Sequence, residues 1–297
     1  MCYITVFTPT YNRVYCLENL YKSLLRQTNR DFEWLIVDDG SSDGTERLVE
    51  KWKMDNHLPI TYIKTLNGGK HRAINKGVTL ARGKYFFIVD SDDYLTDDAI
   101  EIVFFYGLQV ENNDSFAGVC GLRIFPDGKI IGGEVSFEVL DLSSVEYREE
   151  SKRKGDMAEI FKTEVLKLYP FPEFPGENFI KESVVWNRIS LKYKLRYFNK
   201  AIYVCDYLQD GLTRSIRRHL KNNPLGNMLA NKELAGMKVR FITKVKAGIN
   251  YWRYSPIVLF SKRKIIPPLK WMYFLYLGGL FFWLKDLFDD SRRNALL

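Results

Sequence analysis

Three carboxylates within four residues give the strongest chemical signal in this chain of 297 residues. They belong to Asp90-Ser-Asp-Asp93, which directly follows the apolar run Tyr85–Val89. Negative charges this close repel one another unless a cation lies among them, and carboxylate oxygens suit Mg²⁺ or Mn²⁺ bound next to phosphate groups. The cluster therefore predicts a divalent metal site. The alternative is a set of capping residues ahead of a helix that begins near Asp97.

A second acidic cluster, Asp38-Asp39-Gly-Ser-Ser-Asp-Gly-Thr45, follows the apolar run Trp34–Val37. A carboxylate of Asp38 or Asp39 can accept an N–H group of a nucleobase, and the glycines allow the backbone to approach a ligand closely. A tight turn that caps the next helix explains the same residues, since Asp, Ser and Gly favour such turns.

The elements around these clusters alternate between short apolar runs, typical of buried strands, and longer amphipathic runs, typical of helices. This alternation over the first 125 residues predicts an α/β fold with a mainly parallel sheet and helices on both faces. The expected strands are Ile4–Thr8, Trp34–Val37, Ile60–Thr65, Tyr85–Val89 and Ala117–Ile124, and the expected helices are Val14–Gln27, Thr45–Trp52, His71–Ala81 and Asp97–Val110.

Polar clusters follow four of the expected strands, where each strand ends. They are Thr8–Asn12, Asp38–Gly44, Asn67–Lys70 and Asp90–Asp93. In parallel sheets ligands bind beyond the carboxyl ends of the strands. We therefore expect the four clusters to meet at one edge of the sheet and to form one site.

The alternation ends near residue 125. We expect a turn at Phe125–Lys129, a loop over Val139–Asp156, and helices within Met157–Leu168, Phe179–Leu191 and Arg217–Met237. This half is expected to shape the side of the site that receives the second substrate.

The two acidic clusters, preceded by Thr8-Pro-Thr-Tyr-Asn-Arg13, together resemble the motifs of family 2 glycosyltransferases of the GT-A fold. The similarity covers about residues 3–215 and is greatest to bacterial enzymes that build capsular, O-antigen or exopolysaccharide repeats. It implies a GT-A domain over residues 1–210, with a nucleotide-sugar half (1–125) and an acceptor half (126–210), followed by a basic, aromatic helical region (211–297).

The resemblance assigns the base of a nucleotide-sugar donor, by family habit a UDP-sugar, to three residues. Pro9 and Tyr11 would frame the base, with Tyr11 stacking on uracil, and Asp39 beside Asp38 would hydrogen-bond it.

The resemblance also assigns the diphosphate end of the donor. Asp90 would contact the ribose or the diphosphate, and Asp92, with Asp93 as the alternative, would bind Mn²⁺ or Mg²⁺.

Basic residues for the donor come from two further segments. Asn67–Gly77 resembles the family element N-x-G-x-x-x-A-R-N-x-G but has Ile74 where many members have Arg, so Lys70 or Arg72 would supply the positive charge. The segment Asp210–His219 resembles the family's mobile loop that closes on the donor. The candidate phosphate contact in this loop is Arg214, with His219 in a neighbouring role; a solvated basic helix start is the alternative.

An inverting transfer needs a base that takes the proton of the attacking hydroxyl. The family often places it in a Glu-Asp pair that opens a helix, with a large apolar residue three positions after the Asp. Glu182 and Trp186 match this spacing, although Ser183 stands where the Asp usually does. Glu182 is therefore the first candidate base and Glu177 the second; a solvated helix glutamate is the alternative.

The C-terminal region is basic and aromatic. Residues 201–297 hold 17 Lys and Arg against 6 Asp and Glu, a net charge of +11. The uncharged run Trp271–Leu284 is 14 residues long, whereas a spanning helix needs about 20. Its Trp and Tyr content, with Lys270 and Lys285 at its ends, indicates a helix at a lipid headgroup interface; a core or oligomer-contact helix is the alternative.

We therefore expect an inverting, metal-dependent glycosyltransferase that moves a single sugar to a polyprenyl-diphosphate-linked saccharide. It would act as a peripheral, monotopic protein at the cytoplasmic face of a bacterial membrane, with a homo-oligomer possible. The alternative is a non-catalytic nucleotide-sugar-binding or scaffold protein. The basic residues alternate with large apolar ones and no nucleic-acid-binding signature accompanies them, which argues against a nucleic-acid partner.

Overall fold

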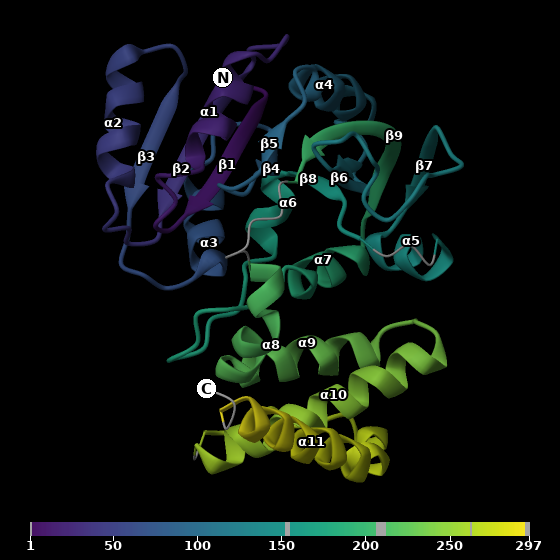
Figure 1. Cartoon of the computed structure of the whole chain (residues 1–297). Coiled ribbons are helices and arrows are strands. Elements are labelled where there is room, and N and C mark those ends of the chain that lie inside the picture. Colours follow the sequence, from purple (N-terminus) through teal and green to yellow (C-terminus); the bar gives the residue numbers. More distant parts are fainter. Residues whose placement is uncertain (1, 152–154, 206–211, 262, 295–297) are drawn as a thin grey trace. The chain divides into compact units, whose positions relative to one another are not determined.

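The computed structural model describes residues 2–151, 155–205, 212–261 and 263–294 (Figure 1). The chain divides into two compact units. The first comprises Met1–Phe171 and Arg188–Gly211, and the second comprises Pro172–Asn187 and Leu212–Leu297. Pro172–Asn187 thus groups with the C-terminal helices, and the predicted boundary at residue 210 stays a prediction.

One sheet organises the first unit. Its strand order is β3-β2-β1-β4-β8-β6-β9-β5, and β7 pairs with β9. The strands are β1 Ile4–Thr10, β2 Phe32–Asp38, β3 Ile60–Lys64, β4 Tyr85–Ile88, β5 Tyr94–Leu95, β6 Phe116–Ile124, β7 Val139–Leu142, β8 Ala158–Lys162 and β9 Lys194–Val204. All five predicted strands are confirmed, with ends that differ by a few residues.

The sheet is mixed, so the predicted parallel pairing is confirmed for β1 to β4 but does not extend to the whole sheet. The four strands β3, β2, β1 and β4 pair in parallel. Beyond them β8 is antiparallel to both β4 and β6, β6 and β9 are parallel, and β5 and β7 are antiparallel to β9. Parallel neighbours need a crossover of a dozen or more residues, usually a helix. Among the later strands only β6 and β9 are parallel, and a long stretch that includes α5, α6 and α7 separates them; the other later pairings are antiparallel.

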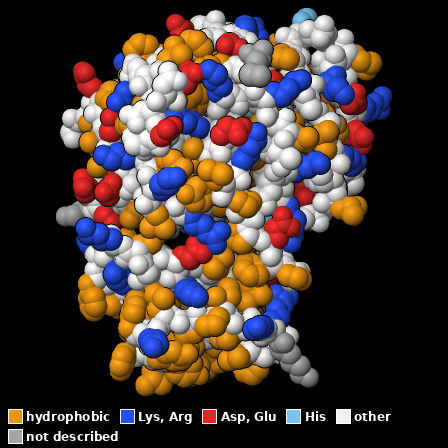
Figure 2. Space-filling view, turned by 180° about the vertical axis from the view of Figure 1, so that it is seen from behind, with side chains coloured by type: hydrophobic (Ala, Val, Ile, Leu, Met, Phe, Trp, Pro, Cys, Tyr) orange, Lys and Arg blue, Asp and Glu red, His pale blue; other side chains and the backbone are white. Residues whose placement is uncertain are grey.

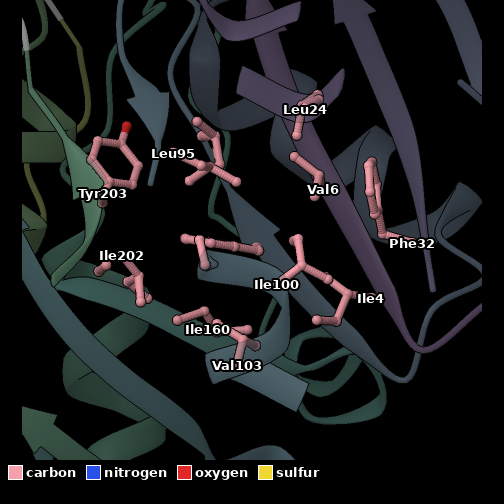
Figure 3. Packing of buried hydrophobic residues seen from close by; sticks show 14 of the residues in the cluster. Ile4, Val6, Leu24, Phe32, Leu95, Ile100, Val103, Ile160, Ile202 and Tyr203 are labelled. Carbon is pink, nitrogen blue, oxygen red and sulfur yellow. The ribbon is translucent and has the colours of Figure 1, made fainter. Parts of the chain in front are cut away.

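Helices cover both faces of the sheet, as predicted. The helices of the first unit are α1 Leu17–Leu25, α2 Thr45–Asp55, α3 Lys70–Leu80, α4 Ala99–Val110, α5 Ser144–Ser151 and α6 Thr163–Leu168. Leu24 of α1 and Ile100 and Val103 of α4 share one core cluster with Ile4 and Val6 of β1 (Figure 3), and α2 adds side chains to the same cluster. The next residue along β1, Phe7, points to the other face, where a Cβ on Gly77 of α3 would lie 2.2 Å from its ring. The period-2 alternation of the strand thus places a helix on each face.

Two predictions for the second half of the first unit are wrong. Val139–Asp156, predicted as a loop, contains β7 and α5. Met157–Leu168, predicted as one helix, contains β8 followed by α6. Helix propensity is a weak prior that tertiary contacts override, and here β4 and β6 offer a hydrogen-bonding partner on each side of β8.

The second unit is helical among its described residues. Its helices are α8 Leu212–Asn222, α9 Pro224–Gly236, α10 Phe241–Phe260, the 3₁₀ helix η1 Lys270–Leu275 and α11 Tyr276–Asn294, and α7 Ser183–Ser190 begins in it. Side chains from α9, α10 and η1 form a separate core around Met228, Tyr251 and Met272. Within the described ranges no helix combines the length and the apolar character that crossing a bilayer requires.

Candidate active site

The loops after β1 and β2 are joined by hydrogen bonds. The Asn12 backbone N–H donates to Ser41 Oγ at 2.8 Å, and the Ser42 N–H donates to Asn12 Oδ1 at 2.8 Å. The Val14 N–H donates to Asp43 Oδ2 at 2.9 Å. The first two predicted clusters therefore form one connected surface at the carboxyl edge of the sheet.

Asp39 joins the second cluster to the third. Its two carboxylate oxygens accept the N–H groups of Gly68 and Gly69, each at 2.7 Å. Gly40 has a φ of +89°, and a Cβ there would lie 3.0 Å from the Asn67 backbone nitrogen, so the close approach of the two loops requires glycine. Burial raises the pKa of Asp39, and the two glycine N–H groups oppose that rise. Asp39 thus fixes the start of α3, which carries Lys70.

Asp38 is completely buried and holds its own loop together. Its Oδ1 accepts the Ser41 N–H at 2.7 Å, and its Oδ2 accepts the Tyr62 hydroxyl at 2.6 Å. These bonds give Asp38 a supporting role behind Asp39, whereas the predicted contact of Asp38 with a nucleotide stays a prediction.

The acidic cluster at Asp90–Asp93 receives a cation from each of two other loops. Lys70 Nζ lies 2.5 Å from Asp90 Oδ1, and Arg13 Nη2 lies 3.9 Å from Asp92 Oδ2. Burial alone would raise the pKa of Asp90, but the charge and hydrogen bond of Lys70 outweigh it and hold that pKa below its ordinary value. All four predicted clusters therefore meet, which confirms their predicted convergence.

The other two carboxyls of the cluster have raised pKa values. For Asp92 the cause is burial and then the charge of Asp90, with Arg13 opposing. For Asp93 burial and the Asp90 charge raise the pKa to about 7, while the hydrogen bond from Tyr203 opposes the rise. Asp92 keeps 23% of its side chain exposed, so a ligand can reach it.

Tyr203 on β9 holds the acidic loop from the antiparallel half of the sheet. Its hydroxyl donates to Asp93 Oδ2 at 2.8 Å and accepts the Asp90 N–H at 3.0 Å. The Arg123 guanidinium lies 4.2 Å from the centre of the Tyr203 ring. Tyr203, Arg123 and Arg13 had no role in the sequence interpretation. The first two lie far from the cluster in the chain, so no local pattern identifies them.

The remaining donor-side candidates lie at the ends of β1 and β3. Pro9 is buried in β1, whereas Tyr11 is 50% exposed, as a ring that stacks on a base must be. Asn67 is exposed, and its side-chain amide donates to the Asp39 carbonyl at 2.9 Å. The buried Thr10 hydroxyl, in β1 between Pro9 and Tyr11, has no hydrogen-bond partner among the described residues.

The two candidate bases lie in the second unit and differ in their surroundings. The Glu177 carboxylate is buried and accepts the N–H groups of Leu225 and Gly226, each at 2.8 Å, and Arg263 Nη1 lies 3.2 Å away. It therefore caps the first turn of α9. Glu182 is partly exposed and directly precedes α7, where its carbonyl accepts the Trp186 N–H at 3.1 Å. Glu182 fits a proton-accepting role better, because the known bonds of Glu177 are structural.

We expect Glu177→Ala to lower the free energy of unfolding by about 2 kcal/mol, because it leaves two backbone N–H groups of α9 and the Arg263 charge without their buried acceptor. A thermal melt followed by circular dichroism measures the change. The control Glu164→Ala replaces an exposed glutamate paired with Lys167, and should change stability by less than about 0.5 kcal/mol. Equal melting temperatures for the two variants would contradict the capping role.

The predicted phosphate contact, Arg214, is described only in part. Arg214 is in α8, but its side chain and Asp210 lie outside the described residues. His219 is described: its ring centre lies 5.5 Å from that of Phe179, and burial followed by the Arg218 charge lowers its pKa.

The donor atoms of the acidic loop fit a metal shared with a phosphate ligand. Among the described residues there is no group of three or more acidic, His or Cys side chains placed to hold a metal unaided. Mg²⁺, however, is usually held by one or two carboxylates together with substrate phosphates. Burial and then the charge of Asp90 raise the pKa values of Asp92 and Asp93, and a cation beside these carboxylates would oppose both effects. These residues therefore fit Mn²⁺ or Mg²⁺.

Comparison with protein families identifies the class of this site. The model of Glycosyl transferase family 2 matches residues 5–128, which include all four clusters. Residues 5–128 are therefore similar to the family 2 glycosyltransferases, and the matched part is less than half of the 297 residues. Curated relatives agree: abequosyltransferase RfbV of Salmonella typhimurium is 39% identical over 103 residues, covering 34% of this chain and 31% of the relative. An uncharacterized glycosyltransferase of Rickettsia conorii is 39% identical over 128 residues, but the match spans only 20% of that relative and 43% of this chain.

A longer match extends past the family domain. The GalNAc(5)-diNAcBac-PP-undecaprenol beta-1,3-glucosyltransferase of Campylobacter jejuni is 28% identical over 219 residues, which is 71% of this chain and 67% of the relative.

Solved structures share the fold. S. aureus TarS 1–349 in complex with UDP-GlcNAc has a TM-score of 0.60 at 20% identity, covering 88% of this chain and 73% of the other. The Pyrobaculum calidifontis mannosyltransferase PcManGT, in complex with GDP-Man and Mn²⁺, has a TM-score of 0.54 at 18% identity, covering 96% and 87%. These likenesses show a mixed α/β fold of the GT-A glycosyltransferase type.

We expect Tyr203→Phe to raise the Mn²⁺ concentration that gives half-maximal activity by about 10- to 100-fold, because the lost hydroxyl orients the loop of the candidate metal ligand. A titration of sugar-transfer activity with Mn²⁺ measures the shift. Tyr197→Phe is the matched control, since this buried tyrosine of β9 stacks on Tyr147 away from the acidic loop. The same shift in both variants would show a general effect of altering β9.

Proposed function

We propose that this chain is an inverting, metal-dependent glycosyltransferase that moves one sugar from a nucleotide-diphosphate donor to a lipid-linked saccharide. The observation that carries this proposal is the set of contacts that joins four loops at one sheet edge inside the family-matched residues. Asp39 holds Gly68 and Gly69, Lys70 pairs with Asp90, and Arg13 faces Asp92.

The donor side of this site suits a nucleoside diphosphate. Tyr11 offers an exposed ring to a base beside Pro9, and Asp39 is the candidate acceptor of a base N–H. Lys70 stands at the start of α3, where a helix N-terminus and an ammonium group both favour phosphate. The neighbours solved with UDP-GlcNAc and with GDP-Man support a sugar nucleotide, and we propose a UDP-sugar.

The chemistry divides between the leaving and the attacking group. Asp92, with Asp93 as the alternative, would hold Mn²⁺ or Mg²⁺, and a metal bound there neutralises charge on the departing diphosphate. Arg13 and Lys70 add positive charge on the same side. Glu182 takes the proton of the acceptor hydroxyl. The hydroxyl oxygen then bonds to the anomeric carbon of the sugar while the bond from that carbon to the diphosphate oxygen breaks. This single displacement inverts the configuration. Arg214 stays the proposed phosphate contact of α8.

The acceptor proposal rests on the Campylobacter relative, whose match covers 71% of this chain. The Campylobacter enzyme is named for a saccharide on undecaprenol diphosphate, and its match continues well beyond residue 128 of this chain. We therefore place the reaction in cell-surface polysaccharide synthesis, at the cytoplasmic face of a bacterial membrane, with the C-terminal segment at the lipid surface.

Donor turnover tests the proposal. The purified protein is incubated with UDP-, GDP- and dTDP-sugars, each with Mn²⁺ or with a chelator, in the presence of a bacterial lipid extract that supplies polyprenyl-linked acceptors. We expect release of nucleoside diphosphate from one donor, only with metal. Absence of both release and metal-dependent nucleotide binding would contradict the proposal.

A non-catalytic nucleotide-sugar-binding protein is the second candidate, and Ser183 is the observation that favours it. The family usually has an acid at this position. Metal-dependent binding of a donor without release, even with the lipid extract present, would identify the chain as such a protein.

A further inference from the structure

The second unit exposes a row of large apolar side chains along one side of α11. Leu277, Phe281, Leu284 and Phe288 are spaced as i, i+4, i+7 and i+11, which places them on one face of a helix. Phe274 of η1 precedes them and is 91% exposed, while Leu277 and Phe281 are 75% and 64% exposed. Figure 2 shows hydrophobic side chains gathered at the lower end of the view, where Figure 1 places α10 and α11.

The opposite side of α11 is packed, so the exposed row is fixed in place. A Cβ on Gly279 would lie 2.2 Å from Trp252 of α10, which shows how closely the two helices approach. Asp286 accepts two hydrogen bonds from Arg253, at 2.7 and 2.6 Å. The ring of Trp283 stacks on that of Phe260 with centroids 5.8 Å apart. The helix thus has one face directed to α10 and another that the described part of the unit leaves uncovered.

The charges around this row are mainly positive. Residues 241–294 contain ten Lys and Arg against three acids, Asp286, Asp289 and Asp290, and Asp286 is engaged by Arg253. Lys264, Lys270 and Lys285 are exposed close to the row in sequence. Tyr273 and Tyr276 are exposed beside Phe274, and aromatic side chains of this kind concentrate at lipid headgroups.

We propose that Phe274, Leu277, Phe281, Leu284 and Phe288, the lipid-docking face, bind an anionic lipid surface with α11 lying in its plane. The alternative occupant of such a face is a second copy of the chain. A two-fold dimer would bring the face against itself and set its lysines beside those of the partner, which is unfavourable. Anionic headgroups neutralise the same lysines while the acyl region takes up the apolar row.

This inference deepens the proposed function. Docking itself does not depend on transferase activity, and only the link to a lipid-linked acceptor rests on the proposed function. The segment Pro172–Asn187, which carries Glu182, belongs to the same unit as the lipid-docking face. Glu177 fixes this segment to α9, and Asn223 Oδ1 accepts the N–H groups of Asn178 and Phe179 at 2.7 and 3.0 Å. Docking of this unit would hold the candidate base at the surface where a lipid-linked acceptor lies.

Vesicle flotation tests the docking face. The full chain is mixed with vesicles of phosphatidylcholine alone or of equal parts phosphatidylcholine and phosphatidylglycerol. We expect flotation with the anionic vesicles, weakened by added salt, and a loss of at least about 10-fold in partition constant for the combined variant Phe274→Ser, Leu277→Ser, Phe281→Ser. The control variant Phe105→Ser, Leu108→Ser changes two exposed apolar residues of α4 and should float like the wild type.

Light scattering, which measures the oligomeric state, distinguishes lipid from a second copy of the chain as the occupant of the lipid-docking face. A wild-type dimer that does not float, and that becomes monomeric in the combined variant, would assign the face to a second copy and overturn the proposal. A wild-type monomer that does not float would overturn it as well. Circular dichroism confirms that each variant is folded. Donor turnover in detergent is measured separately, so a transferase that fails to float, or a floating protein without turnover, identifies which proposal is wrong.

Discussion

Asp92→Asn is expected to lower kcat for sugar transfer by about 100- to 1000-fold. The amide is nearly the same size as the carboxylate but cannot supply the negative oxygen that a divalent cation needs. Because Lys70 already holds Asp90 and Tyr203 already holds Asp93, Asp92 is the carboxylate of the loop best placed to take a new ligand. Initial rates at saturating donor measure the loss of kcat. Calorimetric titration of Mn²⁺ in the presence of nucleoside diphosphate measures the accompanying loss of metal affinity.

Asp97→Asn provides the matched control. This exposed aspartate lies just beyond the acidic loop and pairs with Arg26 at 2.9 Å, so the same chemical change removes only a surface ion pair. Its activity should equal that of the wild type. If Asp92→Asn kept full activity and metal affinity, the metal would have to be assigned to Asp93 or to another site.

Glu182→Gln is expected to lower kcat by about 100- to 10,000-fold while donor affinity stays unchanged, because the amide cannot accept the proton of the attacking hydroxyl. Equilibrium binding of the donor and single-turnover transfer to the lipid-linked acceptor separate the two quantities.

Two further glutamate variants serve as controls for Glu182→Gln. Glu164→Gln, at an exposed glutamate of α6, should leave both quantities unchanged. Glu177→Gln should lose activity only in proportion to its lost stability, since both Glu177 oxygens accept backbone N–H groups of α9. Full transfer by Glu182→Gln would remove this residue from the mechanism.

The parallel half of the fold could be predicted because its signals are local. The strands β1, β2 and β3 are each followed directly by a helix, β4 completes the parallel set, and parallel strands present their carboxyl ends at one edge. Because Asp39, Lys70 and Asp90 all follow strands of this parallel set, their position at that edge is enough to predict that they lie close together. The antiparallel half lacks this signal. The five residues of β8 include Glu159 and could equally form a helix, and only the distant strands β4 and β6 make them extended.

The candidate site divides in the same way. Its carboxylates follow strands and can be found by pattern, whereas Tyr203 contacts Asp93 across 110 residues of sequence. The spacing that singled out Glu177 and Glu182 does not reveal burial, and the cap on α9 that occupies Glu177 depends on residues 225 and 226. Spacing can therefore nominate a base, but only the packing around it distinguishes a reactive carboxylate from a structural one.

The bond between Tyr203 and the acidic loop also sets an order of events during synthesis. Strands β1 to β4 need only residues up to Ile88, so they can pair while the rest of the chain is still on the ribosome. Tyr203 is added about two thirds of the way along the 297 residues. A nascent chain can therefore have a folded nucleotide half whose acidic loop still lacks its hydroxyl partner. A chain that ends before Tyr203 therefore lacks the hydroxyl that supports Asp90 and Asp93, even when β1 to β4 are already paired.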